Sequence, residues 1–290
     1  MNLLYITHPL NGLVMIGLAV GLGIFLTVRF KLGWRLWWIG GFTFFISQVG
    51  HIPFNAGVIG PLISNQVGQL SEPWQLPITA LLLGLSAGIF EEFTRYAVYR
   101  WVIKDARSWS KGLLFGAGHG GIEAIILGII TLFTFIQLIA IKDVDLATIA
   151  PAEQIDIARL QISAYWSMPW YESLMGAVER LFAIPLHLAA AVLVLQSFTR
   201  NQFRWVLYAI GLHTLVNAVA VVLYQNVGVY WTELAIGILA IVDVIIILSL
   251  RQPEPISSIE QDSAELPPVS PIWAPQVSET SENLDSTRYQ

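Results

Sequence analysis

The residues of this chain with the most potential for chemistry are ionisable side chains within long apolar stretches. Glu91, Glu92 and Arg95 lie in one such stretch. An ionisable group at mid-bilayer costs at least ~2.5 kcal/mol on insertion scales, so each needs a physical reason. On a helix Arg95 can pair with Glu91 or with Glu92. We expect Arg95 to neutralise one glutamate while the other points into a cavity; a purely structural ion network is the alternative.

Three histidines recur in separate apolar stretches further along, with polar partners in the patterns Phe115-x-x-x-His119-x-x-x-Glu123, Glu179-Arg180 followed by His187, and His213-x-x-x-Asn217. A spacing of four puts two side chains on one helix face. We therefore expect Glu123 to orient the imidazole of His119, and Asn217 to accompany His213. A lone histidine in an apolar helix is more often an interhelical hydrogen-bonding group, but three in separate helices favour a functional set.

Three imidazoles and a carboxylate in a chain without cysteine match a zinc-type hydrolytic site. In that site His119, His187 and His213 bind the metal, and Glu91 takes the proton of a water or joins the ligands. In a metal-free alternative, Glu91 is a general base and histidine and asparagine donors hold the water and the oxyanion. Gly84-Leu-Ser-Ala-Gly88 has the letters of a serine nucleophile motif but not the strand–turn–helix context that this motif requires.

The elements that must position these residues are membrane helices. Only 12% of the 290 residues are charged, about half the fraction usual in soluble domains. Apolar stretches long enough to span a bilayer occur at about 11–29, 36–60, 77–102, 112–141, 174–197, 203–224 and 229–249. They predict an all-α polytopic bundle of about seven transmembrane helices over residues 1–250, with a four-helix catalytic core at about 77–224. The first stretch has no basic leader or cleavage site, so we expect it to be retained.

Loop charges predict the orientation of this bundle. Basic residues follow the first, third, fifth and seventh stretches: Arg29, Lys31, Arg35, Lys104, Arg107, Lys111, Arg200, Arg204 and Arg251. The positive-inside rule then places the N-terminus outside and the C-terminus in the cytoplasm. Residues 251–290 are rich in Pro, Ser, Glu and Gln and predict a disordered cytoplasmic tail. Residues 152–166 predict an amphipathic helix at the outer interface.

Depth in the membrane groups the candidate residues further. Counted from the cytoplasmic ends of their helices, Glu91, His119, His187 and His213 lie roughly 7 to 11 residues deep, which agrees within about one helical turn. They are therefore expected to form one layer. Three other polar residues fit this layer less well. His51 is interpreted as structural and His8 as solvated outside the first span. Asp243 is expected to be buried without an obvious partner in the sequence, where it either caps a network or lines a path.

These motifs resemble those of a known protease group. Glu91-Glu92-x-x-Arg95, Phe115-x-x-x-His119 and His213-x-x-x-Asn217 resemble the three motifs of the CPBP intramembrane proteases, which include the type II CAAX prenyl endopeptidases. Within the wider clan, Gly116-x-Gly118-His119-Gly120-x-x-Glu123 and Glu179-Arg180 with His187 resemble most the YhfC family of intramembrane metalloproteases, relatives of the PrsW proteases. The resemblance covers about residues 77–224.

The resemblance implies a role for each matching residue. Glu91 is the water-activating carboxylate, Glu92 is held by Arg95, His119 and His213 bind metal or water, and Asn217 assists them. His187 and Glu123 match the YhfC-like pattern. The CAAX motif has one more residue between the second Glu and the Arg, which would turn Arg95 by about 100° around the helix. This difference favours the YhfC and PrsW branch over prenyl-peptide specificity.

Together these features predict an intramembrane endopeptidase with a Glu-activated water and zinc or another divalent metal. We expect a bacterial plasma membrane protein that acts on a membrane protein or peptide, has no nucleic-acid partner, and has a cavity open to the cytoplasm. One alternative is a non-catalytic scaffold or immunity-type protein of the same clan, without a water-accessible pocket. Another is a proton or ion transporter that uses Glu91, Glu123 and Asp243, with a polar path through both leaflets.

Overall fold

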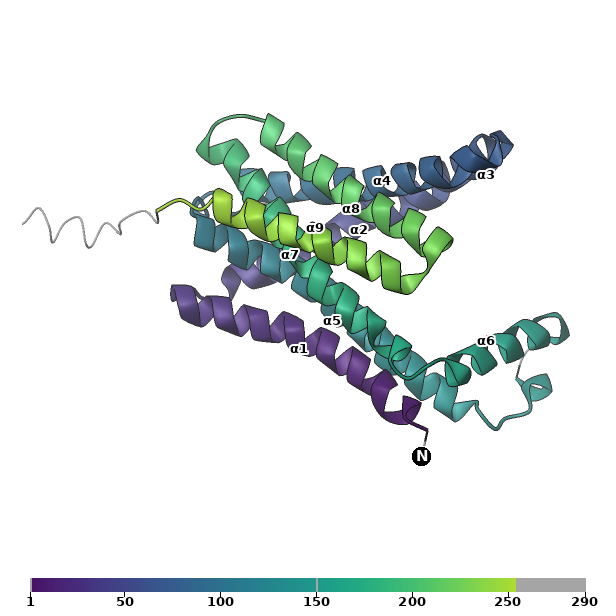
Figure 1. Cartoon of the computed structure of the whole chain (residues 1–290). Helices are drawn as coiled ribbons and strands as arrows, with labels where there is room; N and C mark the ends of the chain where they lie inside the picture. The colour runs from purple at the N-terminus through teal and green to yellow at the C-terminus, as the bar shows by residue number, and fades with distance from the viewer. Residues whose placement is uncertain (1, 150, 254–290) are drawn as a thin grey trace, which may run out of the picture. The chain divides into compact units, whose positions relative to one another are not determined.

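The chain folds into a bundle of long helices (Figure 1). The computed structural model describes residues 2–149 and 151–253. The helices are α1 (Leu4–Phe30), α2 (Arg35–Phe54), α3 (Gly60–Asn65), α4 (Glu72–Trp101), α5 (Trp109–Ala140), α6 (Ile155–Ser167), α7 (Met175–Thr199), α8 (Arg204–Val227) and α9 (Val229–Ser249). The all-α prediction is confirmed. The predicted disordered tail lies almost wholly outside the described residues.

Six of the described helices are long and apolar enough to cross a membrane: α1, α4, α5, α7 (with the short turn before it), α8 and α9. They correspond to six of the seven predicted stretches. These six helices agree with the predicted polytopic bundle of about seven transmembrane helices. The exception is the stretch 36–60, which folds as α2 followed by a π-helical segment, η1 (Asn55–Ile59).

Polar side chains line part of α2. Thr43 and Ser47 are buried, and Gln48 and His51 make hydrogen bonds to groups inside the bundle. This part of α2 meets the polar layer, whereas the start of the helix belongs to the apolar core. Pro53 lacks a backbone N–H and precedes the π-helical segment, a type of distortion that often accompanies functional sites.

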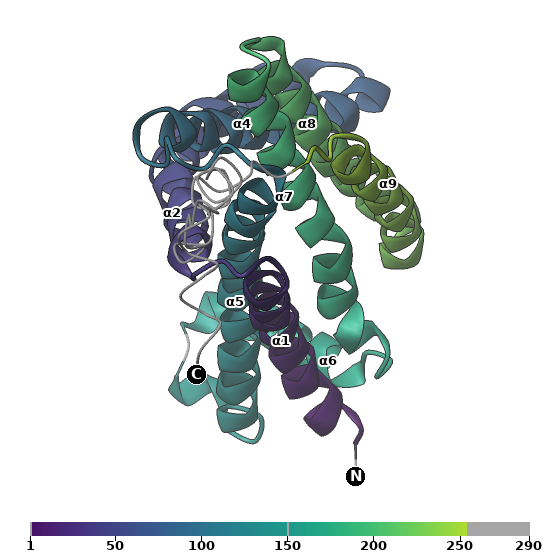
Figure 2. The same cartoon turned by 90° about the vertical axis from the view of Figure 1, so that its left-hand side faces the viewer.

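Helix α5 lies between α1, α2 and α7, and Figure 2 shows this arrangement. On the other side, α7 also packs against α8 and α9, and α4 packs mainly against α8 and α2. The largest apolar core lies on the side of the polar layer that faces the basic loops. Its fully buried members include Tyr99, Leu114, Phe115, Val194 and Val206. Next to this core, the four helices α4, α5, α7 and α8 meet at the level of the candidate residues.

Glycines let α5 approach its neighbours closely. A Cβ at Gly118 would overlap the backbone carbonyl of Trp37 in α2, and a Cβ at Gly120 would lie 2.8 Å from the ring of His187 in α7. Small residues allow this kind of close helix packing in membranes. The glycine-rich segment does not break α5, which runs without interruption from Trp109 to Ala140. The glycines instead bring His119 close to α2 and α7.

The environment of His8 differs from the expectation. This residue lies inside α1 and is buried, not solvated, because its ring stacks on Tyr165 with ring centroids 3.8 Å apart. Tyr165 belongs to α6, so the predicted amphipathic segment is helical and packs on the N-terminal end of α1. Its position at a membrane interface stays a prediction.

Replacement of Gly118 by alanine should destabilise the bundle by about 1–3 kcal/mol, the usual cost of overpacking. The reason is that the new Cβ forces α2 away from α5. Gly211→Ala on α8 is the matched control, because no atom lies within 4 Å of a Cβ at that position. Thermal unfolding in detergent should show a lower midpoint for the first variant only. Equal midpoints would contradict the close α2–α5 contact.

Candidate metal centre

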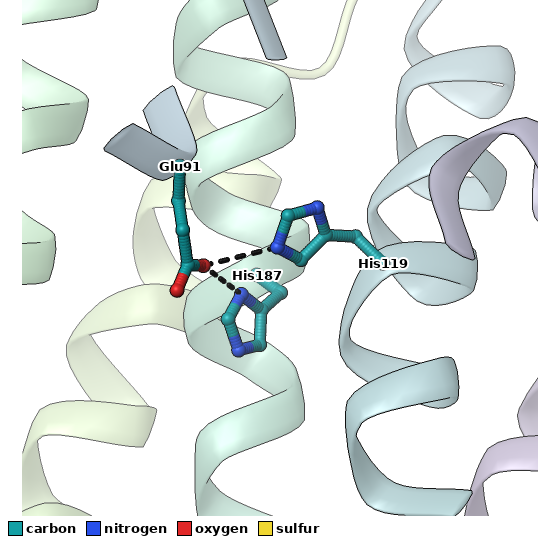
Figure 3. Close-up of side chains that lie close together, drawn as sticks. All are labelled: Glu91, His119 and His187. Carbon is teal, nitrogen blue, oxygen red and sulfur yellow. Dashed lines mark hydrogen bonds and ion pairs between the residues drawn. The ribbon is translucent and has the colours of Figure 1, made fainter. Parts of the chain in front are cut away.

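Three imidazoles surround one carboxylate oxygen in the middle of the bundle. Oε2 of Glu91 lies 3.0 Å from Nε2 of His119, 3.9 Å from Nδ1 of His187 and 3.8 Å from Nε2 of His213. Figure 3 shows the first two contacts, with each side chain coming from a different helix. All four residues are buried. The predicted layer is therefore present, and α4, α5, α7 and α8 each supply one member.

Two of these imidazoles are fixed by a second carboxylate. His213 donates from Nδ1 to Oε1 of Glu92 (2.9 Å), and Nε2 of His187 lies 2.7 Å from Oε2 of Glu123. The ring nitrogen left over on each histidine is the one that faces Glu91. A carboxylate on one imidazole nitrogen sets the tautomer and raises the basicity of the other, as in many histidine–metal sites.

Arg95 pairs with Glu92, as the resemblance implies, and Glu91 remains free to line a cavity. The expectation for Glu123 is wrong, since it contacts His187 and not His119. The ring of His119 turns toward Glu91, and α7 brings His187 against the next turn of α5. Sequence spacing within one helix did not reveal this contact from a neighbouring helix.

A series of ion pairs, here called the charge chain, extends from His187 toward the N-terminal end of α7. Its central member, Arg180, is buried. Arg180 donates from Nη1 to Oε1 of Glu123 (2.7 Å) and from Nη2 to Oε1 of Glu179 (2.6 Å). The side chain of Glu179 is 44% exposed, whereas that of Arg180 is 7% exposed. Arg180 therefore links the carboxylate that holds His187 to a carboxylate at the edge of the site.

Sequence analysis missed Gln48 of α2. It donates from Nε2 to the other oxygen of Glu91, Oε1, over 3.3 Å. His51 in turn hydrogen-bonds Gln48 (3.1 Å) and Ser86 (3.1 Å), which is consistent with its structural interpretation. Gln48 is an amide in a long apolar segment, and this signal was present in the sequence. Its partner on α4 became visible only with the packing of α2.

A cavity of about 90 Å³ adjoins Glu91, His187 and His213, and Asn217 also lines it. Its other walls include Glu179 and Ala220, which also line a larger cavity near the ends of α7, α8 and α9. The opening is therefore directed away from the basic loops. In the predicted orientation this direction differs from the expected opening to the cytoplasm, and the apolar core packed on the basic-loop side accounts for the difference.

The donor atoms suit a divalent cation. Single ligand atoms of Glu91, His119 and His187 lie within 4.8 Å of one another, and Nδ1 of His187 has no hydrogen-bond partner among the described residues. The site and its charge chain contain four carboxylates: Glu91, Glu92, Glu123 and Glu179. Among the described residues, two guanidinium groups pair with carboxylates of this set, those of Arg95 and Arg180. With neutral imidazoles, two negative charges remain uncompensated, and imidazole with carboxylate is a common zinc donor set.

Comparisons with known proteins place the chain in a family. A family model described as YhfC intramembrane metalloprotease matches residues 14–246. The chain belongs to the YhfC family. It is 34% identical over 232 residues to a Bacillus subtilis protein named "Uncharacterized membrane protein YhfC". The matched region covers 75% of this chain and 83% of the relative. No solved structure matches the chain.

Within this YhfC-family bundle α9 carries two further buried carboxylates. Asp243 is almost fully buried, and its Oδ1 has no hydrogen-bond partner among the described residues. Glu233 is also buried, and its Oε2 likewise lacks one in that part of the chain. The sequence marked Asp243 as buried but did not distinguish Glu233, which lies one residue after Thr232 near the start of the helix.

Loss of the Arg180 guanidinium should destabilise the protein strongly. Arg180→Met keeps the length of the side chain but leaves Glu123 and Glu179 without their cation, and breaking a buried pair in this way costs about 3–5 kcal/mol. Equilibrium unfolding in mixed micelles measures the loss.

Arg35→Met is the control for this experiment. Arg35 pairs with Asp105, and their side chains are 58% and 57% exposed. The hydrogen bond from Arg35 lowers the pKa of Asp105, which lies in a loop outside the spans. Exposed pairs contribute little to stability. The same unfolding midpoint for the two variants would contradict a structural charge chain at Arg180.

Proposed function

We propose that this YhfC-family protein is an intramembrane metalloprotease that hydrolyses peptide bonds with a water activated by Glu91. The observation that carries the proposal is the convergence of three imidazole nitrogens on Oε2 of Glu91 within 3.0–3.9 Å. A cavity beside them can admit water, which every hydrolysis within a bilayer needs.

In this proposal His119, His187 and His213 hold a zinc or similar divalent ion. Such an ion polarises a carbonyl group and lowers the pKa of a bound water. Glu92 and Glu123 keep the rings of His213 and His187 in the orientation in which the free nitrogen faces the site. Arg95 and Arg180 compensate these two carboxylates, so that they stay ionised in a buried position.

Glu91 acts as the general base. It takes a proton from the attacking water and passes it to the nitrogen of the leaving amine, which is the usual role of a carboxylate beside a hydrolytic centre. Gln48 holds the oxygen that does not face the histidines and so limits rotation of the carboxylate. Asn217 lines the cavity, where its amide can donate to the carbonyl oxygen of the scissile bond.

The Bacillus relative also supports a proposal for the membrane in which the protein acts. The Bacillus relative supports a bacterial plasma membrane, and the substrate is then a membrane protein or peptide that reaches the site within the bilayer. We extend the proposal to the wider clan of CPBP, CAAX-type and PrsW-like proteases, with the motif at Glu91, Glu92 and Arg95 as its support.

Two other functions receive less support. A scaffold would use the histidines only to join helices, but the cavity at Glu91 argues for a reactive site. A proton or ion transporter needs a polar path through both leaflets. Tyr99, Phe115 and Val194 belong to the tightly packed core on one side of the layer, and this argues against such a path.

Glu91→Gln should reduce cleavage at least a hundredfold, because the amide cannot take the proton and general-base catalysis contributes about 10²–10⁴-fold. Purified protein in lipid nanodiscs, mixed with a library of quenched fluorescent transmembrane peptides, provides the measurement. Glu72→Gln, at the exposed start of the same helix, is the control and should cleave as wild type does. Undiminished cleavage by folded Glu91→Gln protein would reject this mechanism.

A further inference from the structure

A second cavity, of about 310 Å³, lies between the ends of α7, α8 and α9 that face away from the basic loops. We call it the α7–α9 cavity. Its apolar walls include Met175, Val221 and Tyr224. Its volume is at the lower end of the range of small-molecule pockets. Glu179, Ala220 and Ile236 line both this cavity and the one beside Glu91, so the two spaces adjoin.

The charged residues that line the α7–α9 cavity are both acidic. They are Glu179 and Glu233, and no basic side chain contributes to the wall. Glu179 already pairs with Arg180. Glu233 is 9% exposed, and its Oε2 has no hydrogen-bond partner among the described residues. A buried polar group without a partner is costly, and more so when it is charged.

No hydrogen bond joins Arg180 to Glu233 in the described part of the chain. Both of its terminal nitrogens are occupied, one by Glu123 and the other by Glu179. A cation that enters the α7–α9 cavity on an apolar stem would satisfy Glu233 and the walls together. Guanidinium and ammonium groups on aliphatic chains have this chemistry.

We propose that the α7–α9 cavity is a subsite for a basic side chain, arginine or lysine, of the substrate. This inference rests on the proposed protease function, because it gives the adjoining site a substrate preference. Glu233 supplies the unshared carboxylate, and the walls around Tyr224 pack on the aliphatic stem.

Helix geometry limits where this basic residue lies in the substrate. Glu179 precedes His187 by two turns of α7, about 12 Å along the axis. An extended chain advances about 3.3 Å per residue. The basic residue is therefore expected within about four residues of the scissile bond.

A metal ion is a poorer occupant of the α7–α9 cavity. Among the described residues, the only group of three close metal-binding side chains is that of Glu91, His119 and His187. The described residues that line this cavity add no histidine or third carboxylate to Glu179 and Glu233. An organic cation needs only one carboxylate and apolar walls.

Binding of n-butylguanidinium to the purified full-length protein, followed by isothermal titration calorimetry, tests the subsite directly. Wild type should bind this probe at least tenfold more tightly than the uncharged n-butylurea, and Glu233→Gln should abolish the difference. Asp243→Asn is the matched control, because Asp243 is also a buried α9 carboxylate with an unpartnered oxygen but does not line the cavity. Equal binding of both probes by wild type, or unchanged selectivity in Glu233→Gln, would overturn the proposal.

Cleavage gives a second and separable readout. Two transmembrane peptides that differ only in arginine or norleucine near the scissile bond should differ at least tenfold in kcat/KM with wild type. Glu233→Gln should lose this preference and still cleave the norleucine peptide at the wild-type rate. Selective probe binding without cleavage of any peptide would reject the protease function but retain the cation site, whereas equal cleavage of both peptides would reject the substrate preference alone.

Discussion

The structure depends on how negative charge is held inside an apolar bundle. Glu91 and Glu92 are adjacent in sequence, so they cannot share a helix face, and both are buried. Glu92 turns toward Arg95 and His213, whereas Glu91 turns toward three imidazoles and receives a hydrogen bond from Gln48. Because desolvation of a charge is expensive, each helix that meets this layer must bring a partner. The arrangement of α2, α4, α5, α7 and α8 follows from that demand.

Close helix packing makes this layer geometrically feasible. The contact at Gly118 lets α2 lie directly against α5, and the contact at Gly120 leaves space for the ring of His187. Larger residues there would separate the imidazoles by more than one metal ion can bridge, since zinc–nitrogen bonds are only about 2.0–2.1 Å long. The packed core on the basic-loop side then closes the site in that direction, and the remaining space opens toward the other ends of α7, α8 and α9.

Much of this was accessible from the sequence. The lengths of the apolar stretches predicted the long helices. Because a helix advances by a fixed rise per residue, the positions of Glu91, His119, His187 and His213 along their helices placed them in one layer. Partner choice between helices was less accessible. Glu123 was assigned to His119 by spacing on α5, but tertiary packing brought His187 to it, and Gln48 of α2 was overlooked. The direction of the cavity depends on side-chain volumes from several helices, which no single segment encodes.

Metal binding by the histidines of this layer is what the proposed chemistry depends on. The most direct test is the zinc content of the purified protein after loading and dialysis, measured by mass spectrometry. Wild type should retain about one ion per chain, His187→Ala should lose it, and His8→Ala should retain it, because His8 is buried against Tyr165 away from the layer. Wild type without zinc, or His187→Ala with the full content, would contradict the account.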